Sequence, residues 1–233
     1  MLLPLCAYLK FNKRNIKISC IITDHGALPV FFSKNIRTLK SLGLLDASIS
    51  IGNAYGGDYE CVNIYTGLQM ALNVLKTDVV IITMGPGILG TNTPFGFSSL
   101  DMGFYVNFIS KSGGKVLYIP RISFKDSRMR HYGISHHTLN ILAHIIDVPI
   151  PLVFPIINMK KVKFIIHQLK EHKLLEKYSI IFNNGKDILH VLKQFNLNPD
   201  TMGRDVMKDK DFFYALGAVG KYGLSLLNNK QTH

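Results

Sequence analysis

The sequence predicts an α/β protein whose mostly parallel, doubly wound, Rossmann-like sheet is covered by helices on both faces. From residue 17 onward, short runs rich in β-branched residues alternate with longer segments of helical periodicity. Connections that follow the expected strands are polar and rich in glycine, whereas those that lead back into strands contain only ordinary turn residues. With 233 residues, 47% of them hydrophobic, the chain can bury a sizeable core. We therefore expect a single α/β domain over residues 1–233.

The expected strands are short apolar runs bounded by turn residues. In chain order they read ISCIIT, ASISIG, VVIITM, KVLYIP, PLVFPI and SIIF, which are rich in the β-branched and aromatic residues that favour strands. They occupy residues 18–23, 47–52, 79–84, 115–120, 151–156 and 179–182.

The segments between the strands repeat their apolar residues at helical spacing, and residues 1–16 form an N-terminal extension. In the last helix Gly217, Gly220 and Gly223 make a stripe of small residues, although each glycine costs a helix about 1 kcal/mol. Something must pack closely there, either the sheet of the same chain or a second subunit, and we expect a homodimer. The expected helices are residues 28–42, 59–75, 98–112, 135–146, 160–175, 186–195 and 211–227.

The net charge and the cysteine content limit which partners and which cellular compartment we expect for the protein. A formal net charge of +12 would suit a polyanion, an acidic membrane or anionic small molecules, but the basic residues are scattered. Recognition motifs for nucleic acid are not visible, so we expect the protein not to bind nucleic acid. Three irregularly spaced cysteines make no disulfide framework, which favours the cytoplasm, and the N-terminal MLLPLCAYL is neither a convincing signal peptide nor a membrane span.

Four polar connections follow expected strands, at residues 23–29, 52–60, 84–97 and 120–138. The carboxyl ends of parallel strands share one edge of a sheet, where ligands of open α/β folds bind. We therefore expect the four segments to converge on one site.

The third connection contains the pattern G-x-G-x-x-G in GPGILG. A dinucleotide-binding loop would start its helix at the third glycine and would place an acid after the next strand, and this sequence does neither. A P-loop lysine is also missing. Exposed backbone N–H groups and hydroxyls before a helix suit a phosphate or a carboxylate, although a tight structural turn explains the glycines as well. The expected ligand-binding residues here are Gly85, Gly87, Gly90, Thr91 and Thr93.

The fourth connection contains the most side chains that can bind an anion or transfer a proton. Arg128 and Arg130, in an extended stretch, would point the same way and clamp an anion, with Arg121 nearby. Ser135 resembles a helix N-cap and is a further ligand-binding candidate. His136 and His137 would then lie in the first helical turn, where the helix dipole disfavours a charged imidazole.

These patterns predict proton-transfer residues and one competing metal site. The candidate acid–base histidines are His131, His136 and His137, while Asp24 or Asp58 would orient the substrate. As an alternative, a metal would be held by Asp24, Asp58, Glu60 and His136. The adjacent histidines diverge by about 100° on a helix, which argues against chelation by that pair.

The ordered motifs resemble a bacterial family of unknown function with TDGGALP-like, GHAFGGD-like, MGPG-GTGTP-GFS-like and PR-SF-D-R-RH-G-SHHT-like segments. Here they read TDHGALP, GNAYGGDYECVNIYTGL, MGPGILGTNTPFGFS and PRISFKDSRMRHYGISHHT, followed by MGRD and FFYALGAVG. The chain has His25 and Asn53 where the family pattern has Gly and His. The resemblance implies an N-terminal region in longer members that is missing here, and it supplies no reaction.

The favoured hypothesis is an enzyme that binds a small anionic, phosphorylated or nucleotide-like molecule at the carboxyl edge of the sheet. The alternatives are a ligand-binding or regulatory module without chemistry, a metal-dependent hydrolase that uses Asp24 and Asp58, and a structural protein whose loops mediate assembly. The sequence leaves open the substrate, the cofactor, catalysis itself, metal dependence, strand order and oligomeric state.

Overall fold

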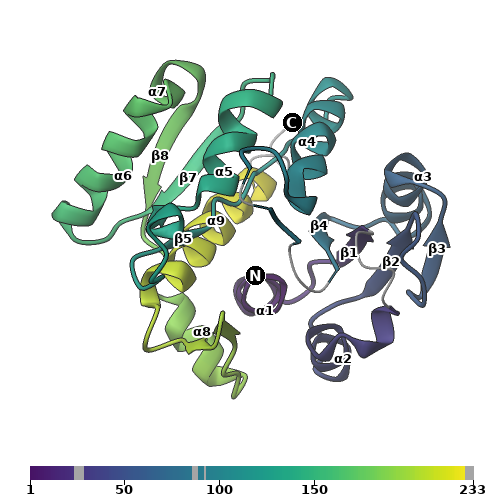
Figure 1. Cartoon of the computed structure of the whole chain (residues 1–233). Coiled ribbons are helices and arrows are strands. Elements are labelled where there is room, and N and C mark those ends of the chain that lie inside the picture. The colour runs from purple at the N-terminus through teal and green to yellow at the C-terminus, as the bar shows by residue number, and fades with distance from the viewer. Residues whose placement is uncertain (24–28, 86–88, 92, 229–233) are drawn as a thin grey trace. The chain divides into compact units, whose positions relative to one another are not determined.

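A computed structural model describes residues 1–23, 29–85, 89–91 and 93–228. By its internal contacts the chain divides into two compact units (Figure 1). The first unit comprises Met1–Thr91 with Phe97–Ser99, and the second comprises Asn92–Gly96 with Leu100–His233. The expectation of a single domain stays a prediction.

The first unit is built on a four-stranded sheet in which every neighbouring pair is parallel. Its spatial order is β3-β2-β1-β4, which matches the 3-2-1-4 part of the doubly wound dinucleotide fold. Ile22 is in register with Ser50 of β2 and with Thr83 of β4, so the three strands end at the same edge. The strands are β1 (Ile18–Thr23), β2 (Ala47–Ile51), β3 (Tyr59–Cys61) and β4 (Val79–Met84).

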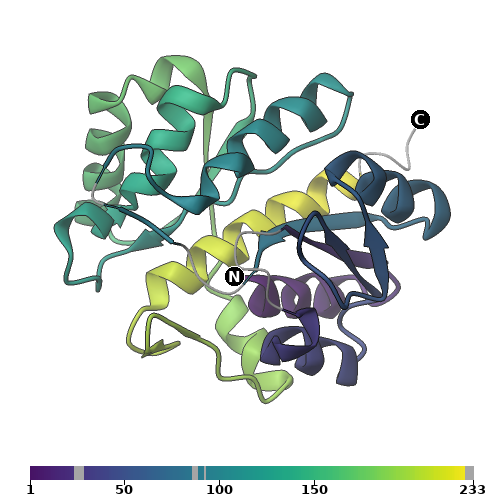
Figure 2. The same ribbon diagram turned by 45° about the vertical axis from the view of Figure 1, so that its right-hand side comes forward.

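Helices cover both faces of this sheet, with α3 on one face and α1 and α2 on the other (Figures 1 and 2). A Cβ added to Gly67 of α3 would meet Ile51 at 3.0 Å and Ile21 at 3.4 Å, which allows α3 to approach the strands closely. The elements are α1 (Leu2–Asn12), the 3-10 turn η1 (Val30–Phe32), α2 (Lys34–Ser41), α3 (Ile64–Gln69) and the π-helical turn η2 (Met70–Val74). The four-stranded parallel sheet flanked by helices confirms the predicted Rossmann-like α/β class.

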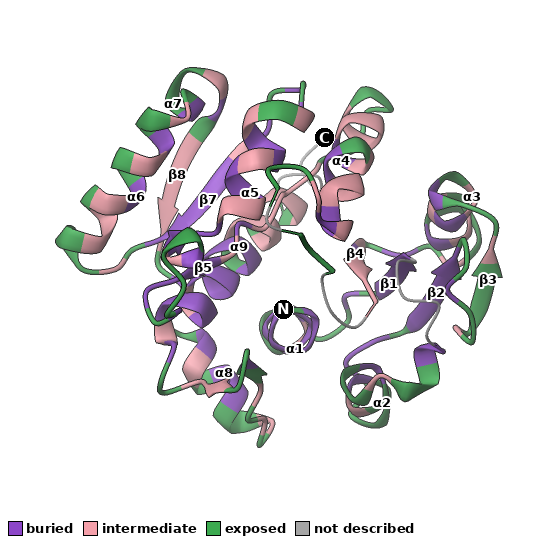
Figure 3. Ribbon diagram, in the orientation of Figure 1, coloured by how far each residue is buried: buried purple, intermediate pink, exposed green. Residues whose placement is uncertain are grey.

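The second unit packs its longest helix, α9, against the parallel pair β7–β8. Figure 3 shows β7 and much of α9 as buried, and Val153, Ala218 and Val219 form a core cluster there. The 3-10 turn η3 (Ser98–Leu100) leads into this unit. Its helices and helical turns are α4 (Asp101–Lys111), η4 (Met129–His131), α5 (His136–Asn140), the π-helical η5 (Ile141–Ile145), α6 (Met159–Glu171), α7 (Leu174–Lys177), α8 (Ile188–Gln194) and α9 (Lys210–Asn228). Its strands are β5 (Ile122–Ser123), β6 (Gly133–Ile134), β7 (Pro151–Pro155), β8 (Ser179–Asn183), β9 (Asp200–Thr201) and β10 (Arg204–Asp205).

Several expected elements differ from those observed. Residues 115–120 are not part of any sheet, although Leu117 and Ile119 pack against the cluster of Val153, Ala218 and Val219. The helix expected over 59–75 begins at Ile64, where Asn63 and Thr66 form a capping box, and the preceding residues are strand β3. Within residues 1–16, expected as an N-terminal extension, α1 buries Leu2–Leu9, an all-apolar run apart from one tyrosine. Among the described residues, no helix is both long enough and apolar enough to span a membrane.

Candidate functional site

The candidate site lies in the second unit on the segment that joins β5 to β6. These two strands pair antiparallel, with Ile122 opposite Ile134. Gly133, the first residue of β6, has a φ of 73°, and an added Cβ would lie 2.6 Å from the Phe164 ring, so only glycine fits there. Gln168 of α6 accepts a hydrogen bond from Ile134 N (2.8 Å) and donates to the carbonyls of Tyr132 and Ile134. Gln168 therefore holds the backbone on both sides of Gly133.

The backbone at Arg121 is held against the beginning of α5. Ser135 N donates to Arg121 O at 2.9 Å, and Arg121 N donates to Thr138 Oγ1 at 3.2 Å. These bonds bring the first arginine of the segment beside the histidines at its end, although they lie ten or more residues apart in sequence.

Three arginines converge on the buried carboxylate of Asp126, whose side chain is 2% exposed. Arg128 donates from Nε (2.9 Å) and Nη2 (3.0 Å) in a bidentate pair, and its backbone N–H also reaches Asp126. Nη2 of Arg121 and of Arg204 each lie 3.5 Å from Oδ2 of the same carboxylate. The hydrogen bonds from Arg128 hold the pKa of Asp126 well below its usual value, so the carboxylate stays charged.

A second buried carboxylate, Asp209, extends this network. Ser123 Oγ donates to its Oδ2 at 2.6 Å and Arg204 Nε donates at 3.0 Å. Among the described residues, no donor reaches Oδ1 of Asp209, although this side chain is fully buried. We call Arg121, Asp126, Arg128, Arg204 and Asp209 the arginine cluster. It holds three cations against two anions, and burial together with repulsion by Arg204 and Arg128 lowers the pKa of Arg121, while Asp126 acts in the opposite direction.

Next to the arginines stand three imidazoles, His131, His136 and His137, which we call the imidazole cluster. Their ring centroids lie between 4.4 and 5.6 Å apart. His131 is 3% exposed and its Nδ1 pairs with Ser135 Oγ at 2.8 Å. Burial, followed by the charges of Arg128 and Arg121, lowers the pKa of His131 to about 4.

The other two imidazoles are also kept neutral near pH 7. Burial lowers the pKa of His137 to about 4, helped by the neighbouring histidines and by Arg130. The pKa of His136 is lowered by burial and by Arg130. Neutral imidazoles were expected from the dipole of a helix starting after Ser135. Helix α5 does start there and continues directly into η5, and burial and arginine charge lower the pKa values of these imidazoles as well. Ser135 does occupy the N-cap position, but its hydroxyl pairs with His131 and not with the helix backbone.

The expected anion clamp of Arg128 and Arg130 rests on an extended stretch that the structure does not contain. Met129–His131 form the 3-10 turn η4. The Nε and Nη2 donors of Arg128 are already engaged by Asp126, so that side chain orders the segment. Arg130 is exposed, and its charge acts on the imidazole cluster.

The other predicted residues lie apart from this cluster in the chain or outside the described residues. Asp24 and Gly87 are among the latter. Asp58 pairs with Lys40 and accepts bonds from the N–H (2.8 Å) and the hydroxyl (2.9 Å) of Ser48, so it anchors β2. Glu60 accepts a bond from Gly56 N at 2.7 Å.

The glycine-rich loop contributes mostly backbone contacts. Gly85 N donates to Thr23 O at 3.2 Å, and Gly90 forms a bridge with Phe97. Thr91 and Thr93 are exposed. In the described part of the chain, no group of three or more His, Cys, Asp or Glu is arranged to hold a metal ion. The roles proposed for these residues, and the convergence of all four loops, stay predictions.

Sequence reasoning missed Asp126, Arg204, Asp209, Ser123 and Gln168. Arg204 lies in the MGRD segment, where the β9–β10 hairpin turns at Met202 (φ 52°) and Gly203 (φ 73°) and pairs Arg204 with Thr201. The charged residues Arg204 and Asp205 beside this turn were a signal from which the sequence could have identified the segment. Gln168 had none, because its partners Tyr132 and Ile134 are remote in sequence. Asp209 lies close to Arg204 in sequence, but its other partner, Ser123, is 86 residues away.

Comparison with known proteins gives one match. A family model described as a protein of unknown function (DUF3866) matches residues 1–220. No curated protein and no solved structure matches the chain.

Proposed function

The chain belongs to the DUF3866 family of proteins of unknown function, and we propose that its second unit binds a small anionic molecule, such as a phosphorylated metabolite, beside the imidazole cluster. The observation that carries this proposal is the convergence of Arg121, Arg128 and Arg204 on one buried carboxylate. With Asp209 included, the cluster still has an excess of positive charge. The Arg128 side chain is 42% exposed to water, whereas Arg121 and Arg204 are mostly buried, and an anionic ligand would supply a counter-charge to these two.

Arg121 and Arg204 are better placed than Arg128 to hold the ligand. Their Nη2 atoms have no hydrogen-bond acceptor among the described residues, and their 3.5 Å approach to Asp126 exceeds a normal hydrogen bond. Their side chains are 17% and 19% exposed and their Nη2 atoms are buried, so a ligand that reached these donors would be largely shielded from water. Phosphate and carboxylate oxygens fit the fork of such donors.

The imidazole cluster gives this site a means of moving protons. A neutral imidazole beside arginines can accept a proton, and a bound anion would offset the arginine charge and raise the pKa of the imidazoles. His136 and His137 are only partly buried and are the proposed proton carriers, whereas His131 is bound to Ser135 and positions them. A site that binds the anion without turnover is the competing function.

Calorimetry of the full chain with inorganic phosphate tests the binding step. Phosphate is expected to bind without added metal, and Arg121→Gln is expected to weaken binding about tenfold, because one charge-assisted bond is lost. The matched control is Lys125→Gln, which removes an exposed cation from the same segment and should leave the affinity unchanged.

Thermal unfolding of each variant shows that it is folded. Equal affinity in the parent and in Arg121→Gln, or binding that a chelator abolishes, would count against the proposal. A screen of phosphate monoesters then separates the two functions: turnover that His137→Gln removes while phosphate still binds supports the enzyme, and binding without turnover supports the module.

A further inference from the structure

The second unit also has a concave surface whose lining residues include no member of the arginine cluster. It is a cleft of about 520 Å³ between α8 and the chain on either side of the β9–β10 hairpin. This volume is within the usual range for small-molecule sites. The lining residues are Leu189, His190, Leu192, Lys193, Asn196, Leu197, Asn198, Val206 and Met207.

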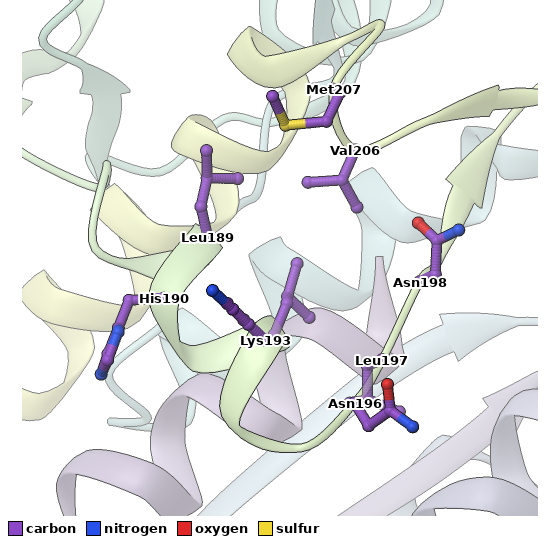
Figure 4. Close-up of a pocket in the computed structure, with 9 residues that line it drawn as sticks. Leu189, His190, Lys193, Asn196, Leu197, Asn198, Val206 and Met207 are labelled. Atoms are coloured by element: carbon purple, nitrogen blue, oxygen red, sulfur yellow. The ribbon is translucent and has the colours of Figure 1, made fainter.

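The walls of the cleft are apolar and its polar groups are few. Figure 4 shows Leu189, Val206 and Met207 around an open space, with the Lys193 amine on the α8 side and the imidazole of His190 directed away from Val206 and Met207. Met207 is 67% exposed, so a ligand in the cleft would remove apolar surface from water.

The charge of the cleft is positive and carried by one flexible side chain. None of the residues that line it carries a carboxylate. Lys193 offers a single ammonium, in contrast to the paired guanidinium groups of the arginine cluster. Asn196 and Asn198 at the far end add amide donors.

We propose that this cleft binds a monocarboxylic acid with an apolar body, of the kind represented by octanoate. The hydrocarbon chain would lie against Leu189, Val206 and Met207, and the carboxylate would pair with Lys193. An amine of the same length would meet the lysine with like charge. A phosphate dianion would find one cation and no bidentate partner, so the cleft and the arginine cluster select different anions.

The methionine methyl groups allow this proposal to be tested residue by residue. The full chain carries eight methionines, and Met207, Met129 and Met159 are all exposed, at 67%, 77% and 66%. Octanoate titrated into protein with ¹³C-labelled methionine methyls is expected to shift the Met207 signal saturably while the Met129 and Met159 signals stay in place. Met207→Leu assigns the signal.

Two lysine variants test the charge requirement. Lys193→Gln is expected to weaken octanoate binding roughly three- to tenfold and to remove most of its salt dependence, because an exposed ion pair is lost. Lys170→Gln, at an exposed position of α6, should bind octanoate as the parent does. Octylamine is expected to shift Met207 only at clearly higher concentration than octanoate, because its ammonium is repelled by Lys193.

Three results would overturn the proposal. They are an equal response to octylamine and octanoate, equal affinity in Lys193→Gln and the parent, and parallel shifts of all exposed methionines, which indicate unspecific apolar adsorption. Because Arg121→Gln leaves the cleft intact, it should bind octanoate normally, so this test is independent of the phosphate site.

Discussion

His131 shows how the neighbours of one residue set its protonation. Its ring pairs with Ser135 and lies close to two further imidazoles, and arginines surround the group. The charged form is penalised by burial and by repulsion at once. The neutral ring is therefore part of the folded structure as well as of the candidate site.

We predict that the protein loses stability as pH falls from about 6.5 to about 4. His131 and His137 keep pKa values of about 4 when folded, against about 6.5 for the free side chain. In that window the unfolded chain binds more protons than the folded chain. Each such group can therefore contribute a slope of up to about 1.4 kcal/mol per pH unit to the free energy of unfolding.

Urea unfolding at several pH values checks this, with His131→Asn to remove one titrating ring while keeping a nitrogen near Ser135. The slope should be smaller in this variant. His167→Asn serves as control because the His167 side chain is 64% exposed and should leave the slope unchanged. A parental slope in His131→Asn would contradict the assignment.

At the scale of elements, the glycines of α9 have an intrachain explanation. A Cβ on Gly217 would clash with the carbonyl of Gly185, and a Cβ on Gly185 would clash with the backbone of Tyr214 and Ala218. The chain after β8 therefore touches the backbone of α9. The small-residue stripe thus has a partner in its own unit at this point, and the homodimer stays a prediction.

Two alanine substitutions in the same helix should have opposite effects. Gly217→Ala is expected to lower the free energy of unfolding by roughly 1–3 kcal/mol, because two backbones must separate. At Gly223 an added Cβ would meet only Leu117, at an ordinary 3.4 Å, so Gly223→Ala should be neutral or stabilise by up to about 1 kcal/mol. Denaturant unfolding measures both, and equal effects would show that the Gly185 contact is unimportant.

At the scale of the whole molecule, the chain divides its expected site residues between two units. The segments after β1, β2 and β4 begin at the edge of the first sheet, whereas the arginine and imidazole clusters belong to the second unit. The sequence predicts one site from all four segments, and the proposed function needs only the last.

Hydrogen exchange with and without phosphate distinguishes these arrangements. Ligand binding slows exchange in the segments that it stabilises. We expect protection at β5, β6 and α5 with no change in β1 and β2, because the proposed anion contacts are all in the second unit. Equal protection of the strand ends of the first unit would favour the single four-segment site. Arg121→Gln, at the same phosphate concentration, provides the unprotected reference.

The sequence by itself determined the α/β class and most element positions, because β-branched runs and helical periodicity are local signals. It also identified the segment containing Arg121, Arg128 and the three histidines as the richest in chemistry. It failed for residues 115–120, which pack apolar side chains on the core as a strand would but do not pair with one, because backbone pairing depends on a neighbouring segment. Only the tertiary structure decided that Arg128 is bound to Asp126, that Asp209 and Arg204 join the cluster, and that burial keeps the imidazoles neutral. These features depend on contacts between remote segments and on exclusion of water, and neither has a period or a spacing that a sequence displays.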